Sequence, residues 1–347
     1  MNETPIFKAI GSNKQPVEKL ELLISYGAKL DVKDRYGDSL LHVACKYGCV
    51  ETVKLLLNTG RVDIESKNND GSTPILVAIR SYKQPVEKMR VLANFGANLD
   101  VKFSNRNAGY WYQNRYDYAG YSLLHYICRY HKVEDVEFLL SKNIDIEIKN
   151  KANESPIISA LRSSKQSIQK VKLLLDKVAQ LDHSSSILHY ACQYGSLDCV
   201  KYFIDKGLDI EGRNDENESP LMLAISSTIQ SLPKVKMLLD AGAKLDSSPN
   251  ILHYACQYGS LGCVKYFINK KRLDIESRDE NNRTPLFYCV LTKRIKFKNK
   301  IDLLLSKNVD KMVRDTNNLS ILQYARQHAR KARVQYLFKN GFTDYSL

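Results

Sequence analysis

The sequence has little of what membrane-spanning, secreted or zinc-binding proteins need. Its 347 residues contain no apolar run of 18 residues, so we expect no transmembrane helix. The first residues, Met1 to Thr4, are not followed by a basic segment and an apolar stretch, so no secretory signal is visible. No two cysteines have Cys-x-x-Cys spacing, which argues against a zinc site. These absences favour a chain that works inside the cell.

The sequence also lacks the short motifs of common enzymes. It has no Gly-rich phosphate loop, no Gly-x-Ser-x-Gly elbow and no His-Glu-x-x-His zinc motif. Aspartate and glutamate are scattered among turn residues, where solvated turn chemistry explains them. We therefore expect no catalytic residues, no cofactor and no metal, and we predict that the protein is not an enzyme.

Cysteine, with eight residues, is present but periodic. Five of the eight recur at equivalent positions, which are Cys45, Cys128, Cys192, Cys256 and Cys289. A small, weakly polar thiol packs well in a core, and such spacing does not require a disulfide framework. We expect reduced structural cysteines and a cytoplasmic location, with the nucleus, or delivery into a host cell, as alternatives.

Internal repetition is the dominant feature of the chain. The pentapeptide His-Tyr-Ala-Cys-Gln and its variants begin at His42, His125, His189, His253 and Gln323. Segments with Thr-Pro or Ser-Pro alternate with them and begin at Thr4, Thr73, Ser155, Ser219 and Thr284. We call the two kinds His-type and Pro-type units. Self-similarity at a fixed period is the signature of a solenoid.

One unit, residues 186–217, shows how each repeat is expected to fold. Ser186 can cap a short helix that Gly195 ends. Apolar residues then recur at helical spacing from Leu197 and predict a second helix that ends at Gly207. The polar residues 214–217 can turn the chain back toward the next unit. The pattern predicts a helix, a turn, a helix and a projecting finger.

These motifs resemble, in split form, the Thr-Pro-Leu-His-x-Ala signature of the ankyrin family. His-type units keep the histidine, as in Ser-Leu-Leu-His-Val-Ala at 39–44, and Pro-type units keep the proline, as in Thr-Pro-Ile-Leu-Val-Ala at 73–78. The resemblance implies an all-α ankyrin-repeat solenoid of about ten helix-turn-helix repeats with projecting β-turn fingers. It also implies that the recurrent histidines hydrogen-bond neighbouring backbone and cap hydroxyls. The paired form resembles the expanded ankyrin families of protists.

We expect a single solenoid over residues 1–347. Its repeats are predicted near residues 4–36, 37–70, 71–103, 120–153, 154–185, 186–217, 218–249, 250–282, 283–318 and 319–347. Pro-type units have two more residues between their helices than His-type units, which predicts a longer turn there. The fingers at 181–184 and 245–248 are expected to be short.

An insertion at 104–119 interrupts the repeats and is rich in aromatic residues and arginine. Insertions of this kind map to one face, often the binding face, and Trp, Tyr and Arg are enriched at interface hot spots. We predict a partner-binding role for Tyr110, Trp111, Tyr112, Arg115, Tyr116 and Tyr118. The alternative is that these rings fold back and pad the neighbouring finger.

A tyrosine recurs near the end of the first helix in the His-type units. The resemblance places this position in the concave groove, where ankyrin repeats vary with their partner. We therefore predict a second group of partner-binding residues, Tyr47, Tyr130, Tyr194 and Tyr258. The alternative is inheritance by duplication, with the rings packed on adjacent repeats.

Positive charge is concentrated at the C-terminal end. Residues 283–347 contain 14 Lys and Arg against 4 Asp and Glu, an excess of 10 in a chain of net charge +14. One turn could form an anion-binding patch of Lys293, Arg294, Lys296, Lys298 and Lys300. The other interpretation is a polar terminal cap that keeps the solenoid soluble.

Together these features predict a non-enzymatic protein–protein interaction scaffold with protein partners and no membrane span. One alternative is an adaptor or effector that recruits partners to other machinery, such as a ubiquitin ligase. Another is binding of an acidic partner or anionic surface by the basic end. Nucleic acid is not expected as a partner, because stacking motifs are absent from that end.

Overall fold

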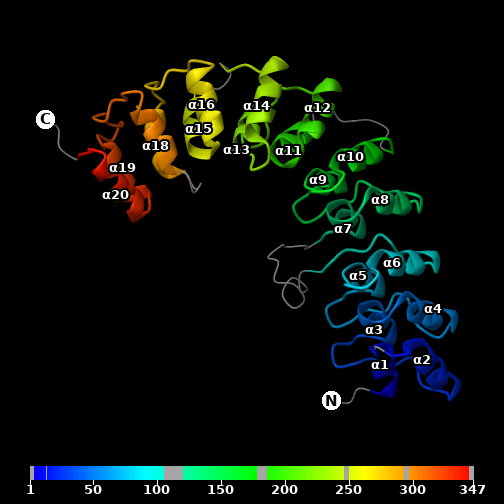
Figure 1. Ribbon diagram of the computed structural model, residues 1–347. Helices are drawn as coiled ribbons and strands as arrows, with labels where there is room; N and C mark the ends of the chain where they lie inside the picture. The colour runs from blue at the N-terminus through cyan, green and yellow to red at the C-terminus, as the bar shows by residue number, and fades with distance from the viewer. Residues whose placement is uncertain are drawn as a thin grey trace. The chain divides into compact units, whose positions relative to one another are not determined.

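The structure is a computed structural model of the chain, which describes residues 4–12, 14–104, 120–177, 186–245, 250–292 and 297–343. Within these ranges regular secondary structure is entirely α-helical, in twenty helices, apart from isolated β-bridges (Figure 1). This confirms the predicted all-α class built from about ten helix-turn-helix repeats. The chain divides into two compact units, Met1–Val178 and Ala179–Leu347, which we describe separately.

The first unit consists of helix pairs in which a first helix is followed by a second. Its helices are α1 (Pro5–Ile10), α2 (Pro16–Ser25), α3 (Leu40–Tyr47), α4 (Val50–Asn58), α5 (Pro74–Ile79), α6 (Pro85–Asn94), α7 (Leu123–Tyr130), α8 (Val133–Leu140), α9 (Pro156–Leu161) and α10 (Ser167–Leu175). First helices pack on first helices, as α1 on α3 and α3 on α5, and second helices pack on second helices, as α2 on α4 and α4 on α6.

The second unit follows the same plan. Its helices are α11 (Ile187–Tyr194), α12 (Leu197–Asp205), α13 (Pro220–Ser226), α14 (Ser231–Asp240), α15 (Ile251–Tyr258), α16 (Leu261–Asn269), α17 (Pro285–Leu291), α18 (Phe297–Leu305), α19 (Ile321–His328) and α20 (Lys331–Lys339). The first helices α11, α13, α15, α17 and α19 contact one another in that order. Each unit therefore buries its core between two rows of helices.

First helices begin in two ways that match the two sequence types. In the His-type helix α3, the extended residue Ser39 accepts the His42 N–H on its Oγ, and His42 Nδ1 accepts the Ser39 N–H at 3.2 Å. In the Pro-type helix α5, Pro74 takes the first position after the extended Thr73. Proline costs nothing there, because the first N–H of a helix has no intrahelical partner.

The predicted side-chain cap at Ser186 is wrong. Its ψ is 16°, whereas the capping serine Ser39 has a ψ of 168°, and its Oγ makes no capping bond. An N-cap side chain reaches the N–H of the third helical residue only from an extended backbone. Asn250, which precedes α15, also lacks a side-chain cap bond and has a ψ of 23°. Both residues follow the fingers predicted to be short, of which residues 181–184 and 246–248 lie outside the described residues.

In four of the five Pro-type units the turn between the helices ends at a glutamine with left-handed backbone. Its φ is 49° at Gln15, 47° at Gln84, 50° at Gln166 and 50° at Gln230. In three of these units the glutamine Oε1 accepts an N–H at the start of the preceding second helix, at 3.3 Å for Val50–Gln84, 3.2 Å for Val133–Gln166 and 3.1 Å for Leu197–Gln230. The glutamine side chain therefore joins its own helix pair to the backbone of the preceding helix pair.

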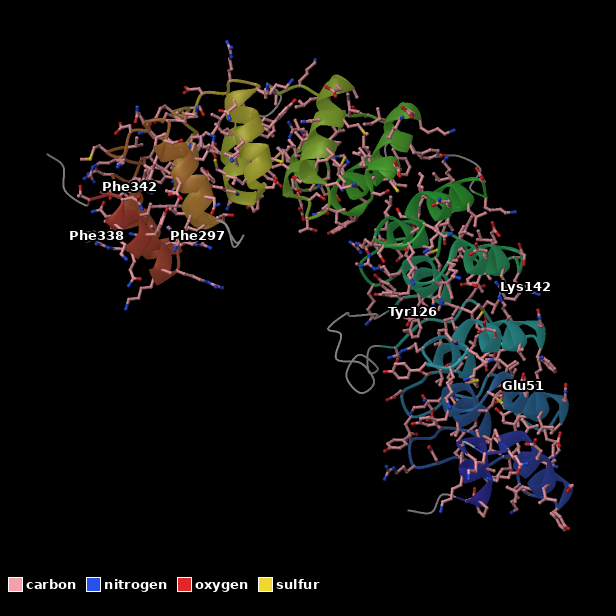
Figure 2. The ribbon with its side chains drawn as sticks, viewed as in Figure 1. Glu51, Tyr126, Lys142, Phe297, Phe338 and Phe342 are labelled. Carbon is pink, nitrogen blue, oxygen red and sulfur yellow. The ribbon has the colours of Figure 1, made fainter. Side chains whose placement is uncertain are left out.

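The insertion leaves and rejoins a closed finger. The Phe103 N–H donates to the Tyr121 carbonyl at 2.8 Å, and the Gly120 N–H donates to the Phe103 carbonyl at 3.0 Å. The Phe103 side chain is buried, and its ring lies 5.4 Å from that of Tyr126. Tyr126 is labelled in Figure 2. The finger that carries the insertion is thus anchored on α7 by an aromatic contact.

Candidate partner-binding site

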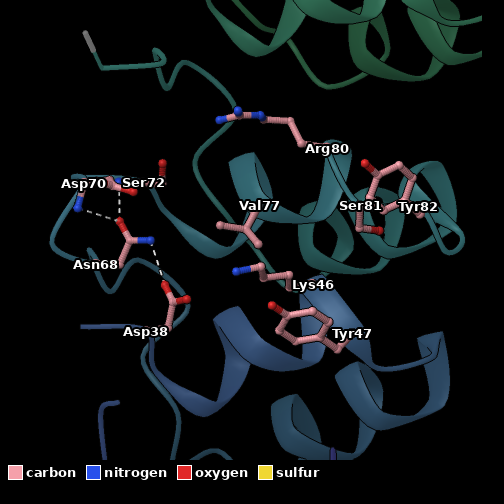
Figure 3. Close-up of a pocket in the computed structure, with 10 residues that line it drawn as sticks. All are labelled: Asp38, Lys46, Tyr47, Asn68, Asp70, Ser72, Val77, Arg80, Ser81 and Tyr82. Atoms are coloured by element: carbon pink, nitrogen blue, oxygen red, sulfur yellow. Dashed lines mark hydrogen bonds between the residues drawn. The ribbon is translucent and has the colours of Figure 1, made fainter. Parts of the chain in front are cut away.

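A hollow lies in the first unit where α3 and α5 meet two neighbouring fingers (Figure 3). It encloses about 120 Å³ and is open to solvent on one side. Its lining residues are Asp38, Lys46, Tyr47, Asn68, Asp70, Ser72, Val77, Arg80, Ser81 and Tyr82. We call this feature the α3–α5 hollow.

The finger side of the hollow is held by an asparagine. Asn68 Nδ2 donates to the Asp38 carboxylate at 2.7 Å, and Asn68 Oδ1 accepts the backbone N–H groups of Asp70 at 3.1 Å and Ser72 at 2.9 Å (Figure 3). These bonds join two consecutive fingers and fix the carboxylate side. Burial raises the pKa of Asp38, while the donated Asn68 bond opposes that shift.

Opposite charges offset one another within the hollow. Burial lowers the pKa of Lys46, whereas the carboxylates of Asp38 and then Asp34 and Asp70 oppose the shift. The Lys46 ammonium lies 4.9 Å from the centre of the Tyr47 ring, and the Arg80 guanidinium lies 5.6 Å from that of Phe103. The hollow therefore carries no strong field of one sign.

Aromatic rings form the exposed edge. Tyr47 is 49% exposed and Tyr82 is 81% exposed, although large apolar rings are usually covered in a folded protein. Val77 lies between Lys46 and Arg80 in the same wall (Figure 3). The arrangement offers apolar area and two rigid rings beside polar groups, which is the composition of small binding sites.

The flank of the insertion touches this wall. Ser104 Oγ donates to the Asp70 carbonyl at 2.6 Å. The insertion residues predicted to bind a partner, Tyr110, Trp111, Tyr112, Arg115, Tyr116 and Tyr118, lie outside the described residues. Their chain nevertheless departs from a residue that contacts the lining of the hollow.

The four recurrent tyrosines, Tyr47, Tyr130, Tyr194 and Tyr258, differ in the rings that lie next to them. Tyr130, Tyr194 and Tyr258 each lie beside a tyrosine four residues earlier on the same helix, with ring centroids 5.0, 6.3 and 4.6 Å apart. Residue 43, the equivalent position before Tyr47, is valine. Tyr47 therefore has no such tyrosine ring on its own helix. Of the four recurrent tyrosines, it is the one that lines the α3–α5 hollow.

The structure removes Lys300 from the predicted anion-binding patch. Its side chain is 1% exposed, and Nζ donates to the Cys256 carbonyl at 2.7 Å and to the Ala255 carbonyl at 3.3 Å. Lys298 is exposed, and its ammonium lies 5.2 Å from the centre of the Tyr336 ring. Lys293, Arg294 and Lys296 lie outside the described residues.

Lys300 belongs to a set that sequence reasoning missed. Lys88, Lys170 and Lys234 are each 0% exposed. Their Nζ atoms donate to the carbonyls of Cys45, Cys128 and Cys192 at 2.9, 3.0 and 2.9 Å. We call these four the buried lysines. The signal in the sequence was a lysine at the same place in every Pro-type unit, which includes Lys19.

The recurrent histidines make structural bonds. His42 Nε2 lies 2.9 Å from the Ser72 carbonyl and Nδ1 lies 2.8 Å from Ser39 Oγ, and His125 repeats both contacts with Glu154 and Ser122. His189 and His253 keep the carbonyl contact, to Gly212 and Arg283, but Nδ1 has no hydrogen-bond partner among the described atoms. Burial lowers the pKa of all four histidines.

The cysteines are free thiols, and seven of the eight are buried. Burial raises the pKa of Cys45, Cys128 and Cys192 to about 12, so these thiols stay protonated and unreactive at neutral pH. Across the described ranges no three His, Cys, Asp or Glu side chains gather where a metal ion could bind. None of the described helices is long and apolar enough to cross a membrane.

Sequence comparison identifies related chains. The family profile described as ankyrin repeats (3 copies) matches residues 6–103, 60–150, 157–249 and 230–315. An ankyrin repeat protein of variola virus is 26% identical over 215 residues, covering 59% of this chain and 35% of the relative. The B-cell lymphoma 3 protein homolog of Mus musculus is 26% identical over 258 residues, covering 72% of this chain and 46% of the relative.

A putative ankyrin repeat protein of Acanthamoeba polyphaga mimivirus is 26% identical over 288 residues, covering 79% of this chain and 30% of the relative. The chain thus spans less than half the length of these relatives. The crystal structure of the human ASB11 ankyrin repeat domain superposes with a TM-score of 0.52 at 24% identity, covering 70% of this chain and 99% of that domain. At that identity the likeness supports the fold alone.

Proposed function

Because this chain belongs to the ankyrin-repeat family, we propose that it is a non-enzymatic scaffold that binds a protein partner through the α3–α5 hollow and the adjoining aromatic insertion. Ankyrin repeats are generally protein-interaction modules and are typically not enzymes. The single observation that carries the proposal is the pair of exposed rings, Tyr47 and Tyr82, at the edge of a hollow whose charges offset one another.

The chemistry of the hollow favours an apolar anchor on the partner. With cations and carboxylates close together, net charge attracts neither acidic nor basic peptides strongly. The area that can be buried is supplied by Val77 and the two tyrosine rings. An aliphatic or aromatic side chain of an extended segment would bury its surface there, while its backbone would meet polar groups of the fingers.

The insertion extends the same surface in this proposal. Its flanking residue Ser104 contacts Asp70 in the wall of the hollow. Its Trp, Tyr and Arg residues are the types that most often dominate binding energy. We therefore assign Trp111 and Tyr112 to the partner contact.

We also propose that the protein works in a reducing compartment such as the cytoplasm, because its cysteines are free thiols and seven of the eight are buried.

The proposal is tested with a peptide ligand selected from a random peptide library on the whole chain. We expect the double substitution Tyr47→Ala and Tyr82→Ala to weaken binding at least tenfold, about 1.4 kcal/mol, because both rings lose their contact area. Isothermal titration would measure the affinities. The matched control is Tyr26→Ala, which removes a tyrosine that is 84% exposed and lies outside the hollow.

Equal affinities of the wild type and the double variant would contradict the hollow as the binding site. A loss of the same size with Tyr26→Ala would show that ring removal acts nonspecifically. Melting followed by circular dichroism should be unchanged in all variants, since each ring is exposed.

A further inference from the structure

Three of the four interior Pro-type units bind the preceding His-type unit with the same two side chains, a glutamine and a lysine. The glutamine Oε1 accepts an N–H at the start of the preceding second helix, as Gln84 does from Val50. The buried lysine donates to a carbonyl near the end of the preceding first helix, as Lys88 does to Cys45. Both contacts are made to backbone atoms, so they recognise the shape of a His-type unit rather than its side chains.

The first Pro-type unit presents this pair to solvent. Gln15 and Lys19 are exposed, whereas the buried lysines of later units are 0–1% exposed. Lys19 Nζ donates to Ser12 Oγ at 2.9 Å, as Lys170 donates to Ser163 at 2.8 Å and Lys234 to Ser227 at 3.0 Å. Lys19 thus makes the hydroxyl contact of the buried lysines. Among the described residues no backbone carbonyl takes the place of the cysteine carbonyl that the later lysines contact.

Lys19 lines an open and largely apolar hollow. It encloses about 410 Å³ and is lined by Pro5, Lys8, Ala9, Ser12, Lys19, Leu22 and Leu23. Leu22 is 58% exposed, and Leu23 is partly exposed. The counterparts of Leu23 are covered in every later Pro-type unit, with exposures of 0% at Leu92, 2% at Leu174, 0% at Leu238 and 0% at Leu304. We call residues 5–23 with this hollow the α1–α2 face.

A matching surface is uncovered on the last described unit, α19 with α20. This unit is His-type, with Gln323 in the place of the histidine. Phe338 on α20, labelled in Figure 2, is 66% exposed. Val334 on the same helix is partly exposed. The counterparts of Val334 in other His-type units, Val53, Val136, Val200 and Val264, are each 0% exposed. We call this surface the α19–α20 face.

We propose that two copies of this chain associate head to tail, with the α1–α2 face of one copy on the α19–α20 face of the other. The contact would continue the alternation of Pro-type and His-type units between molecules. By alignment of the repeats, Lys19 Nζ of one copy would donate to the carbonyl of Arg326 of the other, since Arg326 occupies the position of the cysteine. Gln15 Oε1 would accept the N–H of Lys331. Leu22 and Leu23 would then cover Val334 and Phe338.

The backbone character of the lysine and glutamine contacts explains why the last unit can serve as a partner. Arg326 replaces the cysteine, yet a residue of any type offers a backbone carbonyl. A head-to-tail contact uses two different surfaces, so each added copy leaves one face of each kind available. Association should therefore extend beyond dimers as the concentration rises.

Both faces carry positive charge, which makes the salt dependence diagnostic. Lys8 lies in the hollow beside Lys19, and Arg330 and Lys331 begin α20. Added salt screens their mutual repulsion, so it should strengthen head-to-tail association. Association driven by opposite charges, such as capture of a contaminating polyanion, would weaken instead.

The experiment is sedimentation velocity of the whole chain over a wide concentration range. We expect the weight-average mass to rise above the 39.7 kDa of one copy. Lys19→Glu should hold the mass at one copy, because a carboxylate would face the carbonyl end of α19, and Phe338→Asp should do the same from the other face. Leu22→Asp is a second variant of the α1–α2 face. Lys54→Glu, an equal charge change on exposed α4 surface, should associate like the wild type.

Mixing distinguishes this arrangement from a symmetric dimer. The Lys19→Glu copy keeps its α19–α20 face and the Phe338→Asp copy keeps its α1–α2 face, so their mixture should form dimers and nothing larger. A single-copy mass for the wild type at every concentration would overturn the proposal. So would failure of the mixture to form dimers, or a loss of association with Lys54→Glu.

Discussion

At the scale of the residue, the buried lysines are the least expected feature. Lysine is almost never fully buried unless its charge is paired or its donors are bonded. Here each ammonium donates to a carbonyl of the preceding first helix, and Lys88, Lys170 and Lys234 also donate to a serine hydroxyl. The negative end of the helix dipole lies at those carbonyls and favours a cation there.

Burial nevertheless lowers the pKa of Lys170 and of Lys234 to about 8, below the usual lysine value of 10.5. The unfolded chain therefore binds these protons more tightly than the folded chain between pH 8 and 10.5. Stability associated with each lysine is lowest below pH 8 and is gained as the pH rises through that window.

We predict that the stability difference between wild type and Lys234→Met shifts in favour of the wild type between pH 7.5 and pH 10. The shift should be on the order of 1–3 kcal/mol, because methionine cannot titrate. Denaturant unfolding at the two pH values measures it. Lys201→Met, at an exposed position on α12, should show no such shift. A pH-independent difference for Lys234→Met would mean that its pKa is not lowered by burial.

The contacts of the recurrent histidines could be predicted from the sequence, whereas those of the buried lysines could not. The histidine contacts followed from the ankyrin resemblance, and the structure bears them out in full at His42 and His125. The lysines were not predicted, because an isolated lysine on an amphipathic helix is normally solvated. Their regular spacing was visible, but their role depends on carbonyls about 43 residues away, at a distance that only the stacked fold defines.

At the scale of the element, the glutamine before the second helix does two things in three Pro-type units. It adopts a left-handed backbone, with φ of 50° at Gln166, and its side chain caps the preceding second helix at Val133. Glycine adopts this backbone at little cost, whereas other residues are strained by roughly 1–2 kcal/mol. At Gln166 the side chain therefore contributes through the cap rather than through the turn.

We predict that Gln166→Ala destabilises by about 1 kcal/mol, since it loses the cap and keeps the strained backbone. Gln166→Gly should cost less, because relief of strain offsets part of the lost cap. The denaturant midpoints of the two variants show which of them is less stable. Gln169→Ala, at an exposed position of α10, serves as the control. A glycine variant as unstable as the alanine variant would contradict this division of roles.

Helices were predictable at this scale where local chemistry decides them. Proline at the first position and the serine–histidine capping box mark the starts of α5 and α3 in the sequence itself. The cap expected at Ser186 failed because the same residue type precedes the helix with a different backbone. A capping residue can be read from sequence, but its ψ depends on the finger before it.

At the scale of the whole molecule, near-identical units make dissimilar surfaces. Tyr47 lines the α3–α5 hollow and follows a valine at position 43, where later His-type units carry a second tyrosine. The hollow could not be predicted from sequence, because two fingers, α3 and α5 must all be placed to form it. The insertion was visible as a break in the repeats, yet its contact with the hollow depends on Ser104 and Asp70.

The most direct test of the proposed function is hydrogen exchange of the chain with and without a bound library-selected peptide. We predict added protection at residues 34–47, 68–82 and 105–119, which comprise the fingers, first helices and insertion around the hollow. The second helices α4 and α6 should exchange as they do in the free chain. Protection confined to those second helices, or to residues 297–343 at the basic end, would contradict the account.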